Sequence, residues 1–214
     1  MGDRESNEFY GKFSQHLWHG FHSILSVNKM KHTLSNLLLI SGHPDLQRSI
    51  ANSQILNLLA TTSQIKIHKL DEACQGFQID VPAEQALLTQ ADTIIFQFPL
   101  YWSTYPALMK LWFDEVFTYN FAFGPNGDKL KGKKVILSIT CGATENSYQP
   151  DEFNFLPIEQ YLQAAMHPVK AAQMEIVDTV ITFEMNSTPD EGGDQNTVMQ
   201  LAQQHVERLT HLLN

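Results

Sequence analysis

Short apolar runs alternate along the chain with longer segments in which apolar residues recur every three or four positions. The short runs are typical of β-strands, and they lie at 36–41, 65–70, 93–98, 134–140 and 175–183. The longer segments predict helices, at 49–60, 83–90, 106–117, 157–165 and 196–213. A strand followed by a helix, repeated about five times, predicts an α/β fold in which a doubly wound, five-stranded parallel sheet carries helices on both faces.

The start of the chain departs from this pattern. Acidic residues near the N-terminus and interrupted apolar runs make residues 1–29 a poor signal peptide, and no later segment approaches ~20 uninterrupted apolar residues. We therefore expect an N-terminal extension at 1–29, followed by one domain at 30–214. His16, His19 and His22 lie along one helix edge of the extension, but no carboxylate or thiolate accompanies them, so we predict no metal site.

Composition narrows the functional classes. The chain has 214 residues, 43% of them hydrophobic, and a formal net charge of -9, which argues against a nucleic-acid binder that neutralises phosphates. Its two cysteines, Cys74 and Cys141, are too few for a disulfide framework or a four-cysteine zinc site. We expect a single globular domain in a reducing, cytoplasmic environment.

Ligands of open parallel sheets bind beyond the carboxyl ends of the strands, which directs attention to three loops. The first, SGHPDLQRSIAN, leads into a helix whose N-terminal N–H groups can hold an anion, with His43, Arg48 and Ser49 as further donors. Ser49 could equally do no more than cap that helix. The loop contains neither a dinucleotide fingerprint nor a P-loop.

The second loop, FPLYWSTYP, brings Tyr101, Trp102 and Tyr105 to the end of a buried strand, between Pro99 and Pro106. Aromatic side chains at a strand end suit the wall of a site for a planar ring. The alternative is a hydrophobic cluster beneath the helix that follows.

The third loop, TCGATENSY, also follows a buried strand. Gly142 allows the backbone to approach a ligand closely, while Thr140 and Thr144 supply hydroxyl groups. Tyr148 could present its phenol to the same cleft. Because Cys141 has no cysteine or histidine near it in sequence, we expect an inert small residue rather than a reactive thiol.

Three stretches together carry a resemblance: HPDLQRSIAN, FPLYWSTYPALMKLWFDEVF and TCGATENSY. They resemble the flavodoxin-like NAD(P)H:quinone oxidoreductases, the family of DT-diaphorase, from about Leu37 to the C-terminus. The similarity is greatest to the short bacterial members, some of which are ancillary subunits of glutathione-gated potassium efflux systems. The resemblance implies a flavodoxin-like fold.

It also implies a non-covalent flavin, FMN or FAD, held in three places. The phosphate or pyrophosphate would be bound by His43, Ser49, Ile50, Ala51 and Asn52. The edge of the isoalloxazine would meet Leu100, Tyr101, Trp102 and Ser103. The rim of the ring site would be completed by Thr140, Cys141, Gly142 and Ala143.

The resemblance assigns further roles nearby. Tyr148 corresponds to a catalytic tyrosine near the carbonyl edge of the flavin, although Asn154 stands where the animal enzymes have a partner histidine. Phe121 and Phe123 would line the acceptor pocket, unless they pack in the core. The family also implies a homodimer, with each active site built at the subunit interface.

The implied function is a flavin-dependent NAD(P)H dehydrogenase (quinone), with NADH or NADPH as co-substrate. One shared site predicts ping-pong kinetics and two-electron hydride transfer to a quinone or similar electrophile. Two alternatives remain: an ancillary regulatory subunit of a potassium efflux transporter, and a flavodoxin-type electron carrier. The aromatic residues of the second loop favour a walled site over the exposed ring edge of a carrier.

Overall fold

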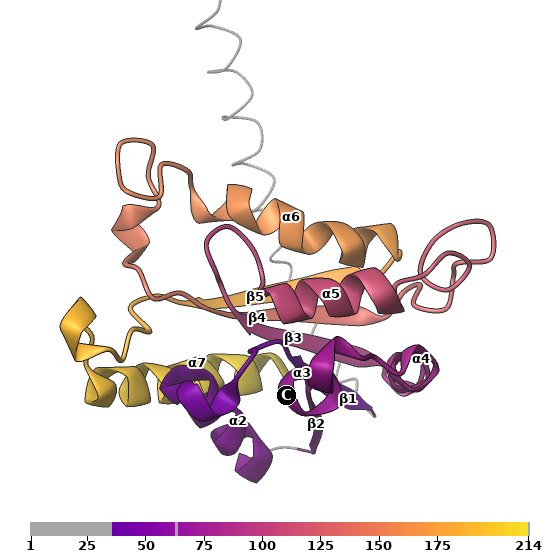
Figure 1. Ribbon diagram of the computed structural model, residues 1–214, viewed down its shortest axis with the longest axis horizontal. Coiled ribbons are helices and arrows are strands. Elements are labelled where there is room, and N and C mark those ends of the chain that lie inside the picture. Colours follow the sequence, from indigo (N-terminus) through magenta and orange to yellow (C-terminus); the bar gives the residue numbers. More distant parts are fainter. Residues whose placement is uncertain (1–35, 63, 214) are drawn as a thin grey trace, which may run out of the picture. The chain divides into compact units, whose positions relative to one another are not determined.

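Five parallel strands pair in the order β2-β1-β3-β4-β5 (Figure 1), in the computed structural model, which describes residues 36–62 and 64–213. The strands are β1 (Leu37–Ser41), β2 (Ile65–Lys69), β3 (Thr93–Pro99), β4 (Lys134–Thr140) and β5 (Glu175–Thr182). All five were predicted, and the α/β class with its parallel sheet is confirmed. The predicted extension at 1–29 lies outside the described residues.

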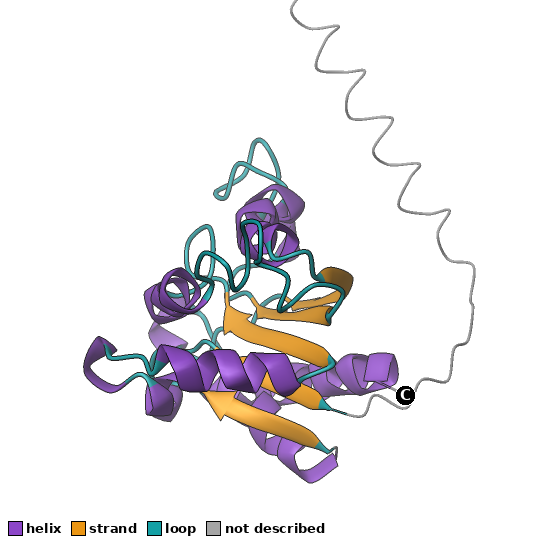
Figure 2. Cartoon of the chain, turned by 90° about the vertical axis from the view of Figure 1, so that its right-hand side faces the viewer, coloured by secondary structure: helices purple, strands orange, loops and turns teal. Residues whose placement is uncertain are grey.

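Helices cover both faces of the sheet (Figure 2). On one face lie α2 (Ile50–Thr62) and α7 (Gln195–Leu213). On the other lie α3 (Leu70–Ala73), α4 (Val81–Gln90), α5 (Ala107–Val116) and α6 (Ile158–Ala171). Short 3-10 turns occur at Leu46–Arg48, Gln75–Phe77, Glu145–Ser147 and Pro189–Glu191.

Alternate strand residues supply the two hydrophobic layers. In β1, Leu38 and Ile40 face the layer of α5, whereas Leu39 faces that of α2 and α7. Every residue of β3, the middle strand, is buried. Successive side chains of a strand point to opposite faces, so a parallel strand covered on both sides needs apolar residues at nearly every position. This explains the unbroken apolar runs in the sequence.

One helix extends well beyond its predicted range, and another was not predicted. The segment ending at residue 165 continues to Ala171, even though Pro168 lies inside it. Proline usually marks a helix boundary, but Val169 beyond it is fully buried, and its packing holds the last turn against the core. The helix α3 was not predicted because four residues are too few to show a helical period.

The outer strand β5 is exposed mainly in its first half, at Glu175, Val177 and Asp178, and its register against β4 shifts between Val135 and Ile136. A wide cleft of about 970 Å³ runs along this edge, and it is lined by residues of β5, α6 and α7. Arg208 of α7 lines the cleft and donates a hydrogen bond of 2.9 Å to the carbonyl oxygen of Ile181. That bond satisfies one of the backbone groups that an edge strand leaves unpaired.

Candidate functional site

The three predicted loops begin at neighbouring positions on one edge of the sheet, because β1, β3 and β4 are adjacent. The amide of Gly42 donates to the carbonyl of Gln97 at 2.8 Å, and the amide of Leu100 donates to the carbonyl of Thr140 at 2.8 Å. The strand pairing thus continues into the loops. In this strand order the direction of the connections reverses between β1 and β3, and such a reversal is where doubly wound proteins bind ligands.

Gly42 lets the first loop lie directly against α5. A Cβ atom at this position would come within 2.4 Å of the sulfur of Met109, which is fully buried. Any other residue would therefore push the loop and the helix apart.

His43 joins the first loop to the second. Its Nδ1 accepts a 3.1 Å hydrogen bond from the amide of Asp45, and its Nε2 lies 3.2 Å from the hydroxyl of Tyr101. The side chain is buried, and this burial lowers the pKa of His43 even though Asp71 and Asp45 oppose the shift. A neutral ring that accepts at Nδ1 carries its proton on Nε2, so His43 donates to Tyr101.

Ser49 caps α2, as one of the two interpretations of its role predicted. Its Oγ accepts hydrogen bonds from the backbone amide of Asn52 at 3.1 Å and from the Asn52 side chain at 3.0 Å. Ile50 is half-buried and Ala51 is buried in the first turn of the helix. The first amides of a helix have no partner within it, so this turn remains a place for an anion.

Asn52 has its hydrogen bonds inside the protein. Only 3% of the residue is exposed, and its Oδ1 accepts from the side-chain amide of Gln97 and, at 3.2 Å, from the hydroxyl of Thr140. Gln97 in turn accepts from Ser41 at 3.1 Å. Asn52 therefore ties the start of α2 to β3 and β4, which places it below the predicted phosphate site as a residue that positions the loop.

The second loop is a tight turn that presents Trp102. Tyr101 and Thr104 exchange backbone hydrogen bonds of 2.9 and 3.2 Å across it. Trp102 has a φ of 56° and is 89% exposed, while Ser103 beside it is also exposed and Leu100 is buried. A positive φ is uncommon for a bulky residue, and strained residues of this kind cluster at functional sites.

Tyr105 corrects the predicted aromatic wall. It is buried, with its ring 5.7 Å from that of Phe98 and 5.1 Å from that of Phe113. It belongs to the hydrophobic cluster beneath α5, which was the alternative considered for this loop. Tyr101 and Trp102 remain as the aromatic residues exposed at this edge.

The third loop combines a fixed start with open space. The amide of Cys141 donates to the carbonyl of Thr182 at 2.8 Å, and the carbonyl of half-buried Ala143 accepts from the amide of Glu184 at 3.0 Å. Between them, Gly142 is exposed, and a Cβ atom there would meet nothing within 4 Å. The loop therefore offers a bare stretch of backbone that a ligand can approach.

Cys141 is fully buried, and burial raises the pKa of its thiol to about 12. The thiol therefore stays protonated at neutral pH, in agreement with the inert role expected from the sequence. Thr140 is buried as well, and its hydroxyl donates a hydrogen bond to Asn52.

Tyr148 is directed into the core rather than into open space. It is 6% exposed, its ring packs against those of Tyr161 and Phe183, and its phenol shares a hydrogen bond with the thiol of Cys141. Burial is the main cause that raises its pKa. In this arrangement Tyr148 supports the third loop through Cys141, and its catalytic role stays a prediction.

Phe121 and Phe123 lie away from the three loops. They belong to the segment that links the end of α5 to the start of β4, beyond the opposite end of α5 from the turn at Trp102 (Figure 1). Phe121 is buried, whereas Phe123 is 47% exposed and packs its ring 5.9 Å from that of Tyr119. Within one chain, neither residue reaches the site edge.

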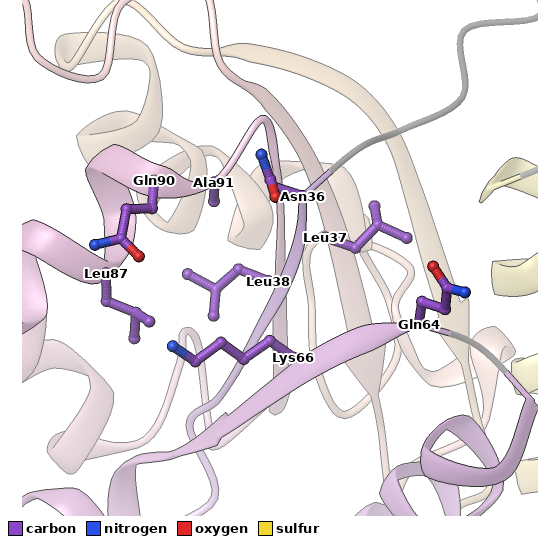
Figure 3. Close-up of a pocket in the computed structure, with 8 residues that line it drawn as sticks. All are labelled: Asn36, Leu37, Leu38, Gln64, Lys66, Leu87, Gln90 and Ala91. Carbon is purple, nitrogen blue, oxygen red and sulfur yellow. The ribbon is translucent and has the colours of Figure 1, made fainter.

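A smaller hollow, of about 180 Å³, opens at the edge of the sheet where the strands begin (Figure 3). Figure 3 shows the amine of Lys66 and the amide of Gln90 around the apolar side chains of Leu38 and Leu87. None of the predicted site residues lines it. It is separate from the three loops.

Residues 36–62 and 64–213 contain neither a metal-binding cluster nor a membrane-spanning helix. No cluster of three or more His, Cys, Asp or Glu side chains in this part of the chain could hold a metal ion. Nor do these residues include a helix long and apolar enough to cross a membrane.

Residues 35–209 match the family described as having the flavodoxin-like fold. Together with the strand order, this match defines the chain as a flavodoxin-like protein. It is 31% identical over 175 residues to an uncharacterized NAD(P)H oxidoreductase, YdeQ, of Bacillus subtilis, covering 82% of this chain and 86% of the relative. It is 40% identical over 149 residues to KefG, the ancillary protein of the glutathione-regulated potassium-efflux system, of an Enterobacter species, covering 70% of this chain and 81% of KefG.

Solved structures agree. General stress protein 14 of Treponema denticola, in complex with FMN, superposes with a TM-score of 0.72 at 28% identity, covering 83% of this chain and 99% of that protein. An NADPH-quinone reductase of P. pentosaceus superposes with a TM-score of 0.64 at 28% identity, covering 80% and 97%. The chain belongs to the flavodoxin-like NAD(P)H:quinone oxidoreductase family, and the resemblance seen in the sequence is confirmed.

Proposed function

We propose that this protein is a flavin-dependent NAD(P)H dehydrogenase that reduces a quinone or a similar electrophile. One observation carries the proposal: the first turn of α2, the exposed ring of Trp102 and the open backbone at Gly142 all lie at one edge of the sheet, on adjacent strands. An anion site, an aromatic surface and a bare backbone are the three features that a flavin phosphate and ring require.

The residues present fit a flavin. The N–H groups at the start of α2 would receive its phosphate, while Ser49 and Asn52 hold that turn in place. Trp102 and Tyr101 would border the ring. The backbone at Gly142 and Ala143 would face its polar edge, since no side chain at Gly142 obstructs the approach. The FMN complex of a structural neighbour favours FMN over FAD.

A bound flavin supplies the ability to accept a hydride from a nicotinamide and to pass two electrons on to a quinone. The chain's own contribution is electrostatic and steric. Backbone N–H groups of the third loop stabilise negative charge without an ionised side chain, since Cys141 keeps its proton. Trp102 orients planar groups. Because donor and acceptor would use one groove in turn, we expect ping-pong kinetics.

We further propose a homodimer in which a partner completes each site. Phe123 and Tyr119 form an exposed aromatic pair far from the site edge of their own chain. A partner chain that brings Phe123 over the three loops would supply the acceptor pocket that one chain lacks. NAD(P)H as the electron donor and two buried free cysteines favour a cytoplasmic location.

The test begins with the purified protein. We expect a yellow protein whose released chromophore has the mass of FMN or FAD, and which oxidises NAD(P)H with a benzoquinone much faster than free flavin does. Initial rates at several quinone concentrations should give parallel double-reciprocal lines. A colourless protein that does not bind added FMN or FAD would refute the proposal.

The similarity to KefG supports a second candidate, an ancillary subunit of a transporter. That role predicts a flavin-binding protein with little turnover of NAD(P)H and quinone, retained by the cytosolic face of an efflux transporter. The turnover measurement above separates the two roles.

A further inference from the structure

Four side chains from three elements form a continuous chain of hydrogen bonds on the α7 face of the sheet. Arg208 donates from Nη2 to the Thr182 hydroxyl at 2.5 Å, and that hydroxyl lies 2.7 Å from Nδ1 of His205. Nε2 of His205 lies 2.7 Å from the hydroxyl of Ser138. His205 and Ser138 are fully buried, and Thr182 is nearly so.

The direction of these hydrogen bonds follows from the donors. A guanidinium group only donates, so the oxygen of Thr182 accepts from Arg208 and its own O–H is free to donate to Nδ1 of His205. The neutral ring then carries its proton on Nε2 and donates to Ser138. If the ring were protonated, Nδ1 would carry a hydrogen and could no longer accept from Thr182. Its positive charge would also be repelled by the charge of Arg208. Burial and that charge both lower the pKa of His205.

The same threonine anchors the third loop. Its backbone carbonyl accepts the amide of Cys141 at 2.8 Å, and the carbonyl of Cys141 accepts the amide of Met185 at 2.9 Å. The third loop, which exposes its backbone at Gly142, is therefore hydrogen-bonded at its first residue to Thr182. The hydroxyl of Thr182 is in turn bonded to His205. Ser138, bonded to the other nitrogen of the histidine, lies inside β4, two residues before Thr140.

Apolar side chains could fill this part of the core at lower cost, because burying polar groups is unfavourable unless every one is bonded. A fully bonded chain instead fixes one relative position of β4, β5 and α7. Among the buried residues of α7, His205 is polar and the others are apolar.

We propose that His205 is a positioning residue for the flavin site: through the hydroxyl of Thr182 it fixes the backbone from Cys141 to Ala143. The proposal rests on the proposed function, because it concerns the loop assigned to the flavin ring. His205 itself does not touch the site.

The test compares four variants. The amide oxygen of His205→Asn can replace Nδ1 and reach Thr182, whereas the longer side chain of His205→Gln reaches toward Ser138. Thr182→Val removes the hydroxyl with little change of shape. Ser138→Ala is the matched control, since it removes another buried hydroxyl that is bonded to His205, on the nitrogen away from Thr182.

The first readout is amide hydrogen exchange in protein without added flavin, followed at the amides that anchor the third loop, those of Cys141, Glu184 and Met185. We expect exchange to rise about three- to tenfold in Thr182→Val and His205→Gln, the range that corresponds to one lost hydrogen bond. Ser138→Ala and His205→Asn should stay within about twofold of wild type. The second readout, the dissociation constant for FMN from fluorescence titration, should follow the same order.

Equal effects of Ser138→Ala and Thr182→Val would overturn the proposal, because they would indicate general loosening of the core. So would unchanged exchange in Thr182→Val and His205→Gln. If the wild-type protein binds no flavin, the proposed function fails, and the exchange data still decide whether His205 fixes the loop. If it binds flavin and exchange is unchanged, only the role of His205 fails.

Discussion

His205 should make the free energy of unfolding depend on pH between about 6.5 and 4.5, above the pH range in which most carboxylates take up protons. Burial lowers the pKa of His205 from 6.5 to about 3. The unfolded chain takes up a proton near pH 6.5, whereas the folded chain resists it. The contribution of this histidine is therefore fully present above pH 6.5 and is lost as the pH falls toward 3.

The magnitude follows from the size of the shift. One pKa unit corresponds to about 1.4 kcal/mol, so lowering the pH from about 6.5 to about 4.5 should remove roughly 2–3 kcal/mol of unfolding free energy through this group alone. In His205→Asn that contribution disappears. The variant will be less stable at pH 7, but its unfolding free energy should fall less steeply as the pH is lowered.

Urea denaturation at half-unit steps between pH 7 and pH 4.5 measures both slopes. His167→Asn is the control, because it removes an exposed histidine of α6 and leaves His205 in place. Subtracting the two curves removes the titration of all other groups. Parallel curves for wild type and His205→Asn would refute the reasoning, since they would show that His205 is not held neutral in the fold.

Three further predictions follow from the same geometry. Trp102→Ala should change the unfolding free energy by less than about 0.5 kcal/mol, because the ring is 89% exposed, yet should weaken FMN binding about tenfold in a fluorescence titration. Asn52→Ala should lower the unfolding free energy by about 1–3 kcal/mol in urea, because Gln97 loses a buried acceptor, and should also weaken FMN binding. Glu84→Ala should cost about 3 kcal/mol in the same assay and leave FMN affinity unchanged, since Glu84 accepts from the buried indole of Trp112 at 2.8 Å and belongs to none of the three loops.

The fold class could be predicted from the sequence because a strand that is buried on both faces appears as an unbroken apolar run. Apolar runs such as the one at 93–98 can be buried strands only where helices cover both sides, and the helical segments between them supply that cover. The order of the strands in the sheet was not predicted, because local patterns do not record which strands are neighbours.

The sequence predicted which loops form the candidate site, but not the direction in which their side chains point. Sequence places Tyr101, Trp102 and Tyr105 in one loop, yet only the backbone path decides that Trp102 faces outward while Tyr105 turns into the core. Tyr148 shows the same limit. Motifs locate a loop, whereas the direction of each side chain depends on packing against segments distant in sequence.

The buried polar network was missed, although it left a signal. Gln97 and Ser138 interrupt otherwise apolar strands, TIIFQF and KVILSIT, and a polar residue within a fully buried strand requires a partner. Their partners, Asn52 and His205, lie on helices that only the folded structure brings beside them. Polar residues in predicted central strands are thus a useful guide to positioning residues.

The proposed dimer predicts that each active site needs residues from both chains. The strand β4 that separates Phe123 from the site edge has seven residues, which span roughly 20 Å, so Phe123 can serve a flavin only in a partner's site. Each site would then need Trp102 from one chain and Phe123 from the other. Trp102→Ala and Phe123→Ala should each impair both sites of their own homodimers.

Mixing the two variants under conditions of subunit exchange should restore activity. Random pairing makes about half of the dimers mixed, and each mixed dimer has one site with both residues intact and one with neither, so about a quarter of all sites should regain wild-type turnover of NAD(P)H and benzoquinone. A matched mixture of Trp102→Ala with Trp102→Phe shares the same side of the site and should show no such gain beyond the average of its parents. If activity in the first mixture also stays at the average of its parents although mixed dimers form, Phe123 does not act across the interface, because complementation requires each chain to complete the site of the other.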